Sequence, residues 1–231
     1  MVKKYLANTW NVAMKLNKRN ILELIEEYPN QKILDLGCDD GSWTLEISKK
    51  AKSKKLYGID IVTERLNKAK KNGIKTKRGD LNNRWPYPNN YFDLVHSNQV
   101  IEHLWDIDLF AKETKRILKK GGYSIVSTEN LSSWVNIASL ILGWQPFSIT
   151  NISFNHGGLG NPFSFYRHKK PKLNSWTHTR VMAITALKEL FENYGFTVEK
   201  TYGSGYFPLP AIMGRIDSVH SHFITIKIRK K

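Results

Sequence analysis

The feature that most constrains this chain is a strand-like stretch, a glycine loop and a helix start that follow one another within residues 33–43. The apolar run contains Asp35, the loop is opened by Gly37 and closed by Gly41, and an amphipathic helix begins near Trp43. A strand, a tight glycine turn and a helix form a crossover unit that binds nucleotides in many α/β proteins. Because glycine lets a ligand approach the main chain closely, we expect a nucleotide-like ligand at this loop.

The acids of this loop narrow the class of ligand. A dinucleotide fingerprint, G-x-G-x-x-G, needs glycine where this chain has Asp39, and Asp40 follows directly. Two carboxylates would repel a pyrophosphate. They suit a ligand without phosphate and with positive charge, such as S-adenosylmethionine (SAM), which carries a sulfonium and an α-ammonium group. A plain strand, turn and helix is the alternative interpretation of this stretch.

Several motifs together resemble one enzyme family. The pattern Asp35-Leu36-Gly37-Cys38-x-x-Gly41 resembles motif I of the class I SAM-dependent methyltransferases. The stretches 92–95 (Phe-Asp-Leu-Val), 101–104 (Ile-Glu-His-Leu) and 116–122 (Arg-Ile-Leu-Lys-Lys-Gly-Gly) resemble, in their order, the small-molecule branch of that class, the quinone-biosynthesis type or methyltransferase type 11. The resemblance covers residues 32–129 well and 180–231 in outline. It implies SAM as the cofactor and methyl transfer as the activity.

Two acids beyond the loop are expected to contact the cofactor. Asp60 lies 23 residues after Gly37, near the offset of about 20 residues at which a carboxylate meets ribose hydroxyls; its alternative role is the N-cap of a helix over 61–72. The resemblance implies that Asp80 accepts from the adenine amino group beside Leu81, and the alternative is a turn aspartate. The expected cofactor-binding residues are Asp35, Gly37, Cys38, Asp39, Gly41, Asp60, Ile61, Asp80, Leu81, Ser97 and Asn98.

Alternating strand and helix patterns predict an α/β fold. The expected strands are 32–36, 55–60, 74–78, 91–97 and 123–128, and the helices between them are 42–51, 61–72 and 108–118, the last ended by Gly121 and Gly122. Such alternation favours a parallel sheet with helices on both faces. A helix over 179–194 and strands over 196–202 and 222–229 follow. The resemblance implies a Rossmann-like, doubly wound sheet of seven strands, the last antiparallel.

The 231 residues are expected to form one methyltransferase domain with two additions. Residues 1–30 form an N-terminal helical segment, whose helix should end at Pro29. Residues 131–180 contain no Asp or Glu, five Lys or Arg and eight aromatic residues, without clear periodicity. A segment of this length inside a compact fold is typical of a lid or cap. The resemblance implies that it covers the substrate.

The net charge and the cysteine content limit which ligands and partners this protein can have. The net charge of +16 would attract nucleic acid non-specifically. However, residues 97–100 (Ser-Asn-Gln-Val) replace the Asp/Asn-Pro-Pro-aromatic motif of enzymes that methylate nucleic-acid amines. The single cysteine, Cys38, excludes a disulfide framework and a Cys-rich zinc site, and no metal site is expected. There is no run of 18 apolar residues and no signal-peptide pattern, so we expect a cytoplasmic location.

The candidates for chemistry are histidines and arginines. His103, His178 and His156 are the candidate general bases, although each could have only a surface or hydrogen-bonding role. Arg167 and Arg180 are the candidate substrate-binding residues for an anionic acceptor, unless they only solvate the lid. The expected function is methyl transfer to a small-molecule or glycan/lipid-linked acceptor at oxygen. An RNA-directed methyltransferase and a non-catalytic SAM-binding protein are the alternatives, and the oligomeric state is left open.

Overall fold

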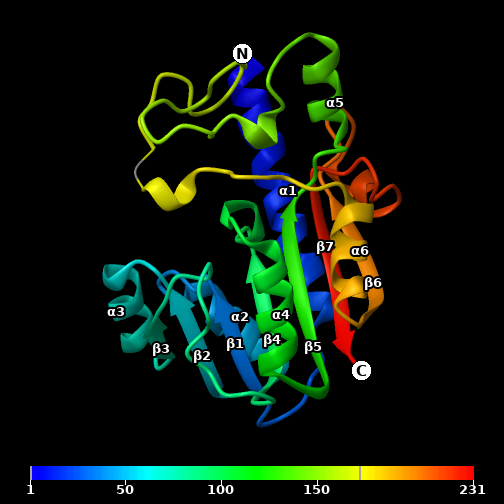
Figure 1. The fold of residues 1–231 in the computed structure, drawn as a ribbon. Coiled ribbons are helices and arrows are strands. Elements are labelled where there is room, and N and C mark those ends of the chain that lie inside the picture. The colour runs from blue at the N-terminus through cyan, green and yellow to red at the C-terminus, as the bar shows by residue number, and fades with distance from the viewer. Residues whose placement is uncertain (1, 172) are drawn as a thin grey trace.

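The computed structural model describes residues 2–171 and 173–231 and is built on a single seven-stranded sheet (Figure 1). The strand order is β3-β2-β1-β4-β5-β7-β6, and β7 alone runs antiparallel to its neighbours. The strands are β1 (Lys32–Leu36), β2 (Lys55–Asp60), β3 (Lys75–Arg78), β4 (Phe92–Asn98), β5 (Leu118–Glu129), β6 (Phe196–Ser204) and β7 (Phe223–Lys230). This confirms the Rossmann-like sheet expected from the sequence.

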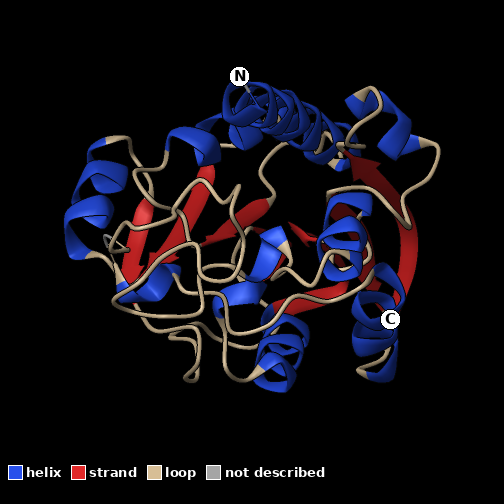
Figure 2. Ribbon diagram, turned by 90° about the horizontal axis from the view of Figure 1, so that it is seen from above, coloured by secondary structure: helices blue, strands red, loops and turns tan. Residues whose placement is uncertain are grey.

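Helices cover both faces of the sheet (Figure 2). They are α1 (Val2–Leu24), α2 (Ser42–Ala51), α3 (Thr63–Lys71), α4 (Ile107–Ile117), α5 (Trp134–Ile141) and α6 (Ile184–Asn193). Short 3-10 helices add η1 (Ile101–His103), η2 (Phe147–Ile149), η3 (Asn174–Trp176) and η4 (Ala211–Arg215).

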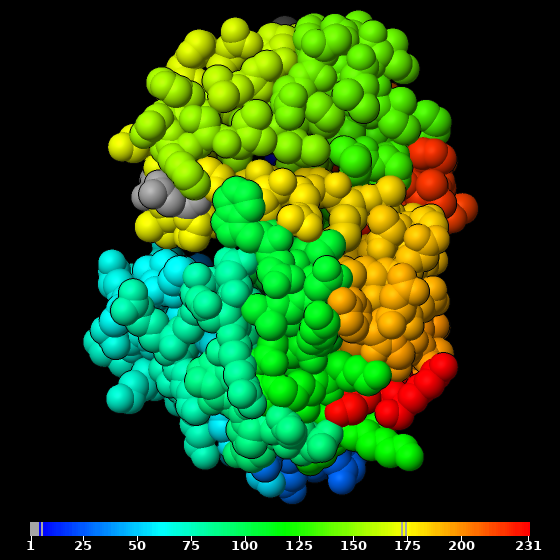
Figure 3. Space-filling view, in the orientation of Figure 1, coloured from blue at the N-terminus to red at the C-terminus, as the bar shows by residue number. Residues whose placement is uncertain are grey.

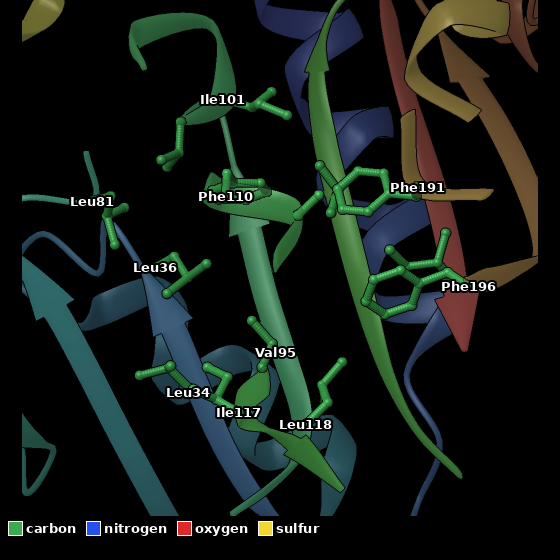
Figure 4. Packing of buried hydrophobic residues seen from close by; sticks show 14 of the residues in the cluster. Leu34, Leu36, Leu81, Val95, Ile101, Phe110, Ile117, Leu118, Phe191 and Phe196 are labelled. Atoms are coloured by element: carbon green, nitrogen blue, oxygen red, sulfur yellow. The ribbon is translucent and has the colours of Figure 1, made fainter. Parts of the chain in front are cut away.

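Successive strand residues supply two separate hydrophobic layers, since side chains alternate across a strand. Leu34 belongs to the layer that holds Phe110 of α4 and Phe191 of α6 (Figure 4). Ile33 belongs to the opposite layer, together with Ile21 of α1 and others from α2 and α3. With both faces buried, the parallel strands have a firm register, and their carboxyl ends meet along one edge.

Two helices, α1 and α4, end earlier than predicted. The first helix, α1, ends at Leu24, before the predicted end at Pro29. Tyr28, which follows the helix, is exposed. Helix α4 ends at Ile117 because Leu118 is already extended and pairs with Phe92, which places Gly121 and Gly122 inside β5.

The predicted helix over 179–194 begins five residues late, at Ile184. Thr179 donates from its backbone amide to the backbone oxygen of Glu102 at 2.9 Å, and from its hydroxyl to the backbone oxygen of Leu104 at 2.8 Å. These long-range bonds hold the chain extended at Thr179, so Arg180 does not stand at a helix N-terminus.

The segment 131–180 lies above the carboxyl edge of the sheet (Figure 1). It contains α5, η2 and η3, and a parallel bridge between Asn130 and Met182 closes its base. In the space-filling view it forms the upper part of the molecule, over the sheet and its helices (Figure 3). Among the described residues, no helix combines the length and apolar character needed to cross a membrane.

Candidate functional site

A cavity of about 480 Å³ opens at the carboxyl ends of β1, β2 and β4. Its lining includes Gly37 and Asp39 of the glycine loop and Phe154, Leu173 and Trp176 of the segment 131–180. The complete lining is Gly37, Asp39, Asp60, Ile61, Val62, Arg65, Gly79, Asp80, Leu81, Asn82, Gln99, Val100, His103, Leu104, Trp105, Phe154, Leu173, Ser175, Trp176 and Thr177. The cavity therefore lies between the carboxyl ends of β1 to β4 and the segment 131–180.

The glycine loop has the backbone that the sequence predicted. Gly37 has a φ of +69°, and a Cβ built there would lie 2.7 Å from Cγ2 of Val100. Gly41 has a φ of +79°, and a Cβ there would lie 2.3 Å from Cδ1 of Ile74. Both positions therefore need glycine, for conformation and for space.

Asp60 joins the end of β2 to this loop. One carboxylate oxygen, Oδ2, accepts from the backbone amide of Asp39 at 3.0 Å, and Oδ1 accepts from the amide of Val62 at 2.9 Å. Helix α3 has Val62 at its N-cap, without a side-chain cap bond. The helix-cap interpretation of Asp60 is therefore wrong, and its carboxylate lines the cavity.

The two loop acids have different surroundings. Asp39 lines the cavity and pairs with Arg65 at 2.9 Å, and Arg65 lines the cavity as well. Asp40 accepts from the backbone amide of Ser42 at 2.9 Å and is not part of the lining. The negative charge that faces the cavity is thus that of Asp39 and Asp60 and, further along, of Asp80.

Five of the expected cofactor-binding residues do not line the cavity: Asp35, Cys38, Gly41, Ser97 and Asn98. Asp35 is buried beneath the loop, where it accepts from Thr44 at 2.5 Å and contacts Nδ1 of His96 at 2.7 Å. Burial raises the pKa of the Cys38 thiol, so this cysteine stays protonated and is no nucleophile. Asp35 holds the start of helix α2 and strand β4 together beneath the loop.

The structure brings two of the candidate histidines together. The rings of His103 and His178 lie 4.9 Å apart, edge to face. Nδ1 of His103 lies 3.0 Å from the backbone oxygen of Thr177, and Nδ1 of His178 lies 2.6 Å from that of Ser148. Because a carbonyl oxygen only accepts, each Nδ1 carries a proton, and in the neutral ring of His103 the lone pair is on Nε2. His156 is exposed and is not among the cavity residues.

Burial lowers the pKa of His103 to about 4, because the charged ring would lose its hydration. Its imidazole is therefore neutral near pH 7 and presents an acceptor nitrogen at the cavity wall.

Neither candidate substrate arginine lines the cavity. Nη2 of Arg180 donates to the backbone oxygen of Trp105 at 2.7 Å, and Nε of Arg167 lies 3.1 Å from Nε2 of His168. The arginine that does reach the lining is Arg65, which is paired with Asp39.

Two acids near the histidines were missed, Glu102, which is buried, and Glu129, which is half-buried. Glu102 is buried, its Oε2 accepts from the hydroxyl of Thr128 at 2.8 Å, and burial raises its pKa to about 7. Glu129 ends β5, with its Oε2 4.0 Å from Nδ1 of His178. Glu102 stands beside His103 in the sequence, which was an available signal, but nothing in the sequence places Glu129 near either histidine.

The profile of the methyltransferase domain family matches residues 11–201 of this chain. The chain belongs to that family. A probable SAM-dependent methyltransferase of Mycolicibacterium smegmatis is 30% identical over 173 residues, which cover 74% of this chain and 54% of the relative. A ubiquinone biosynthesis O-methyltransferase of Pelagibacter ubique is 32% identical over 126 residues, 51% of this chain and 52% of the relative. The chain thus spans about half the length of these curated relatives.

A solved SAM-dependent methyltransferase from Mesorhizobium loti has the same fold, with a TM-score of 0.61 and 19% identity over 92% of this chain and 96% of its own. Together with the family match, these likenesses confirm the resemblance to class I SAM-dependent methyltransferases, and support SAM as the cofactor that the glycine loop predicted.

Proposed function

We propose that this protein transfers a methyl group from SAM to a hydroxyl oxygen of a small-molecule acceptor. The observation that carries this proposal is that one cavity is lined both by Asp60 and the glycine loop and by His103. SAM supplies an electrophilic methyl group on a sulfonium. An enzyme of this kind must align the acceptor oxygen with that group and assist the loss of its proton.

The residues present fit this cofactor. The carboxylate of Asp60 still has lone pairs for ribose hydroxyls beyond its two backbone bonds. Ile61 and Leu81 offer apolar walls for the adenine, and Asp80 an acceptor for its amino group. Because Gly37 leaves the main chain uncovered, the loop can approach the ligand without a side chain between them.

His103 is proposed to position the acceptor hydroxyl. Its Nε2 can accept a hydrogen bond, because the Thr177 carbonyl holds the proton on Nδ1. With a pKa of about 4 it is a weak base. It therefore orients the hydroxyl and polarises its O–H bond; as the oxygen bonds to the methyl carbon, the bond from that carbon to the sulfonium sulfur would break and the proton would pass to water.

The acceptor class is supported by the relatives. The Pelagibacter ubique protein is named for O-methylation in ubiquinone biosynthesis, which favours oxygen as the methylated atom and a small molecule as the acceptor. A glycan or lipid-linked hydroxyl is included in this class.

We also propose that residues 131–180 form the substrate lid, since Phe154, Leu173 and Trp176 of that segment line the cavity. We further propose that the protein acts in the cytoplasm.

The net charge of +16 favours RNA as the second candidate acceptor. Labelled methyl from SAM should be offered to a metabolite extract and, separately, to total RNA. The proposal expects label in a compound of low molecular mass and none in RNA. Label in RNA would favour the second candidate. Binding of SAM with no labelled product in either pool would identify a SAM-binding protein without catalysis.

A further inference from the structure

Three segments that are distant in the sequence form the end of the molecule above the carboxyl edge of the sheet (Figure 1). They are residues 5–16 of α1, residues 131–180 and residues 205–222, which together we call the cap end. The hydroxyl of Tyr5 donates to the backbone oxygen of Pro208 at 3.3 Å, and the rings of Trp134 and His220 stack with their centres 4.4 Å apart. A small apolar groove is lined by side chains of all three segments, so they form one continuous region.

Exposed apolar side chains are concentrated at the cap end. Among the residues that the structure describes, nineteen large apolar side chains are exposed, and sixteen of them belong to these three segments, which hold 80 of the 231 residues. Ile216, beyond η4, is 87% exposed, and Ile141, the last residue of α5, is 80% exposed between the exposed Leu140 and Leu142. Single exposed apolar residues are ordinary, but a large group of them marks a surface that binds a partner.

The cap end also has almost no negative charge. Its three segments contain seven Lys or Arg and a single acid, Asp217, although the whole chain has 20 acids. Asp217 is already bonded within the cap end, to Nδ1 of His220 at 2.8 Å and to the hydroxyl of Tyr206. Lys169 and Lys170 are exposed. The surface therefore combines exposed apolar side chains with net positive charge.

We propose that the cap end docks on the surface of a lipid bilayer that contains anionic lipids. This goes beyond methyl transfer and does not depend on it. Apolar side chains stabilise a protein at the boundary between lipid headgroups and acyl chains, and each Lys or Arg close to anionic headgroups strengthens the binding. Trp and Tyr favour the same boundary, and Trp10, Trp134 and Tyr166 are among the exposed side chains of the cap end.

Two other partners fit this surface less well. A second copy of the chain would bring one positively charged surface against another, and the only acid of each surface, Asp217, is already bonded to His220. Nucleic acid would be attracted to the cations, but its bases stack on aromatic rings and gain little from aliphatic side chains such as Ile141 and Ile216. Lipid phosphates and acyl chains match both the charge and the apolar side chains.

Flotation of the full chain with lipid vesicles tests the proposal. Vesicles of phosphatidylcholine alone are compared with vesicles of phosphatidylcholine and phosphatidylglycerol in equal amounts. We expect binding to the mixed vesicles that is stronger by at least roughly tenfold than binding to phosphatidylcholine alone. Added salt should weaken this binding without abolishing it, because salt screens charges but not apolar contacts. Lipids brominated on their acyl chains should quench the tryptophan fluorescence of the bound protein.

The matched variants are Ile141→Glu and Tyr28→Glu. Tyr28 is 63% exposed but lies between α1 and β1, at the opposite edge of the sheet. Both substitutions change the net charge equally, so a difference between them reports the place of contact. Ile141→Glu should weaken binding to the mixed vesicles by roughly tenfold or more, because an apolar side chain no longer enters the bilayer, and Tyr28→Glu should not. Ile216→Glu is a second, independent variant of the cap end and should act like Ile141→Glu.

Four results would overturn the proposal. The first is no binding of the wild-type chain to the mixed vesicles, and the second is equal weakening by Ile141→Glu and Tyr28→Glu. The third is binding that salt abolishes and Ile141→Glu leaves unaltered, which would mean adsorption through lysines elsewhere on the surface. The fourth is a dimer in sedimentation without lipid, or a complex with RNA, that Ile141→Glu dissociates, which would assign the cap end to that partner. Methyl transfer is not measured in any of these experiments, so the proposed function stands or fails separately.

Discussion

The carboxylate of Asp60 accepts a hydrogen bond from the backbone amide of Asp39 at 3.0 Å, which joins the end of β2 to the glycine loop across the cavity floor. Replacing Asp60 by Ala removes this bond and the proposed acceptor for the ribose hydroxyls. We expect the affinity for SAM and for its demethylated product to fall by about 1–3 kcal/mol, the worth of charged hydrogen bonds. Calorimetry measures both.

The matched control is Glu64→Gln on the neighbouring helix α3, where Glu64 pairs only with Lys68 at the surface. It should leave both affinities unaltered. Tight binding of a nicotinamide dinucleotide and none of SAM, in the wild-type chain, would contradict the cofactor assignment.

Gly37→Ala should lower cofactor affinity and stability together. The new Cβ would lie 2.7 Å from Val100, and the backbone is in the left-handed region at a φ of +69°. Gly73→Ala separates backbone strain from the contact of the new Cβ, since Gly73 has a φ of +81° but nothing lies within 4 Å of its Cβ position. Chemical unfolding should show a strain cost of about 1 kcal/mol for each, and calorimetry a loss of SAM binding for Gly37→Ala alone. Equal SAM binding by both variants would show that the loop tolerates a side chain.

Glu102 should make the protein less stable as pH rises. Burial raises its pKa from 4.5 to about 7, so between these values the folded protein holds a proton that the unfolded chain has released. The free energy of unfolding then falls with rising pH, by at most about 3 kcal/mol. Glu102→Gln removes this dependence. Urea unfolding from pH 5 to 8 should show that the free energy of unfolding of the variant increases relative to that of the wild type as pH rises.

His103 acts in the opposite sense at lower pH. Its lowered pKa, about 4, makes the folded protein lose stability as pH falls from about 6.5 toward 4. That contribution is common to both proteins, so their difference isolates Glu102. A difference that does not vary with pH would mean that Glu102 is ionised throughout.

Trypsin should cut the lid after Lys169, which is exposed; the next lysine, Lys170, precedes Pro171, and trypsin does not cut that bond. The glycine stretch 157–160 is a poorer target for proteases, because Gly158 is packed so closely that a Cβ would lie 2.4 Å from the backbone nitrogen of Arg167. When the demethylated cofactor and an acceptor are bound, the cut should be slower, because Trp176, which follows the cleavage site in the chain, lines the cavity. Mass spectrometry follows the products.

Cleavage after exposed Lys54, at the opposite edge of the sheet, serves as the internal control and should keep its rate. If the lid is cut equally fast with and without ligands, the segment 131–180 is a fixed structural layer and not a lid.

Local patterns predicted much of the sheet and the glycine loop that lines the cavity. The strand β1, the helix α2 and the strand β2 have the boundaries expected from apolar runs and glycines. Gly37 has the left-handed backbone expected of a tight turn after a buried strand, and the carboxylate of Asp60 accepts a hydrogen bond from the same loop.

Long-range contacts decided the rest. Asp35 looked like a ligand residue, yet His96 and Thr44 hold its carboxylate beneath the loop. Helix α6 begins late because Thr179 bonds to η1, 77 positions away along the chain. Such partners come from other elements, and no local pattern contains them.

The sequence by itself determined the fold class and the glycine loop, because backbone conformation and hydrophobic periodicity are local properties. Only the tertiary structure joined His103 to His178, left His156 outside, and placed Glu129 4.0 Å from His178. Those relationships depend on which strand ends meet at one edge and on where the cap lies over it. The chemistry of the acceptor end therefore depends on packing between distant segments.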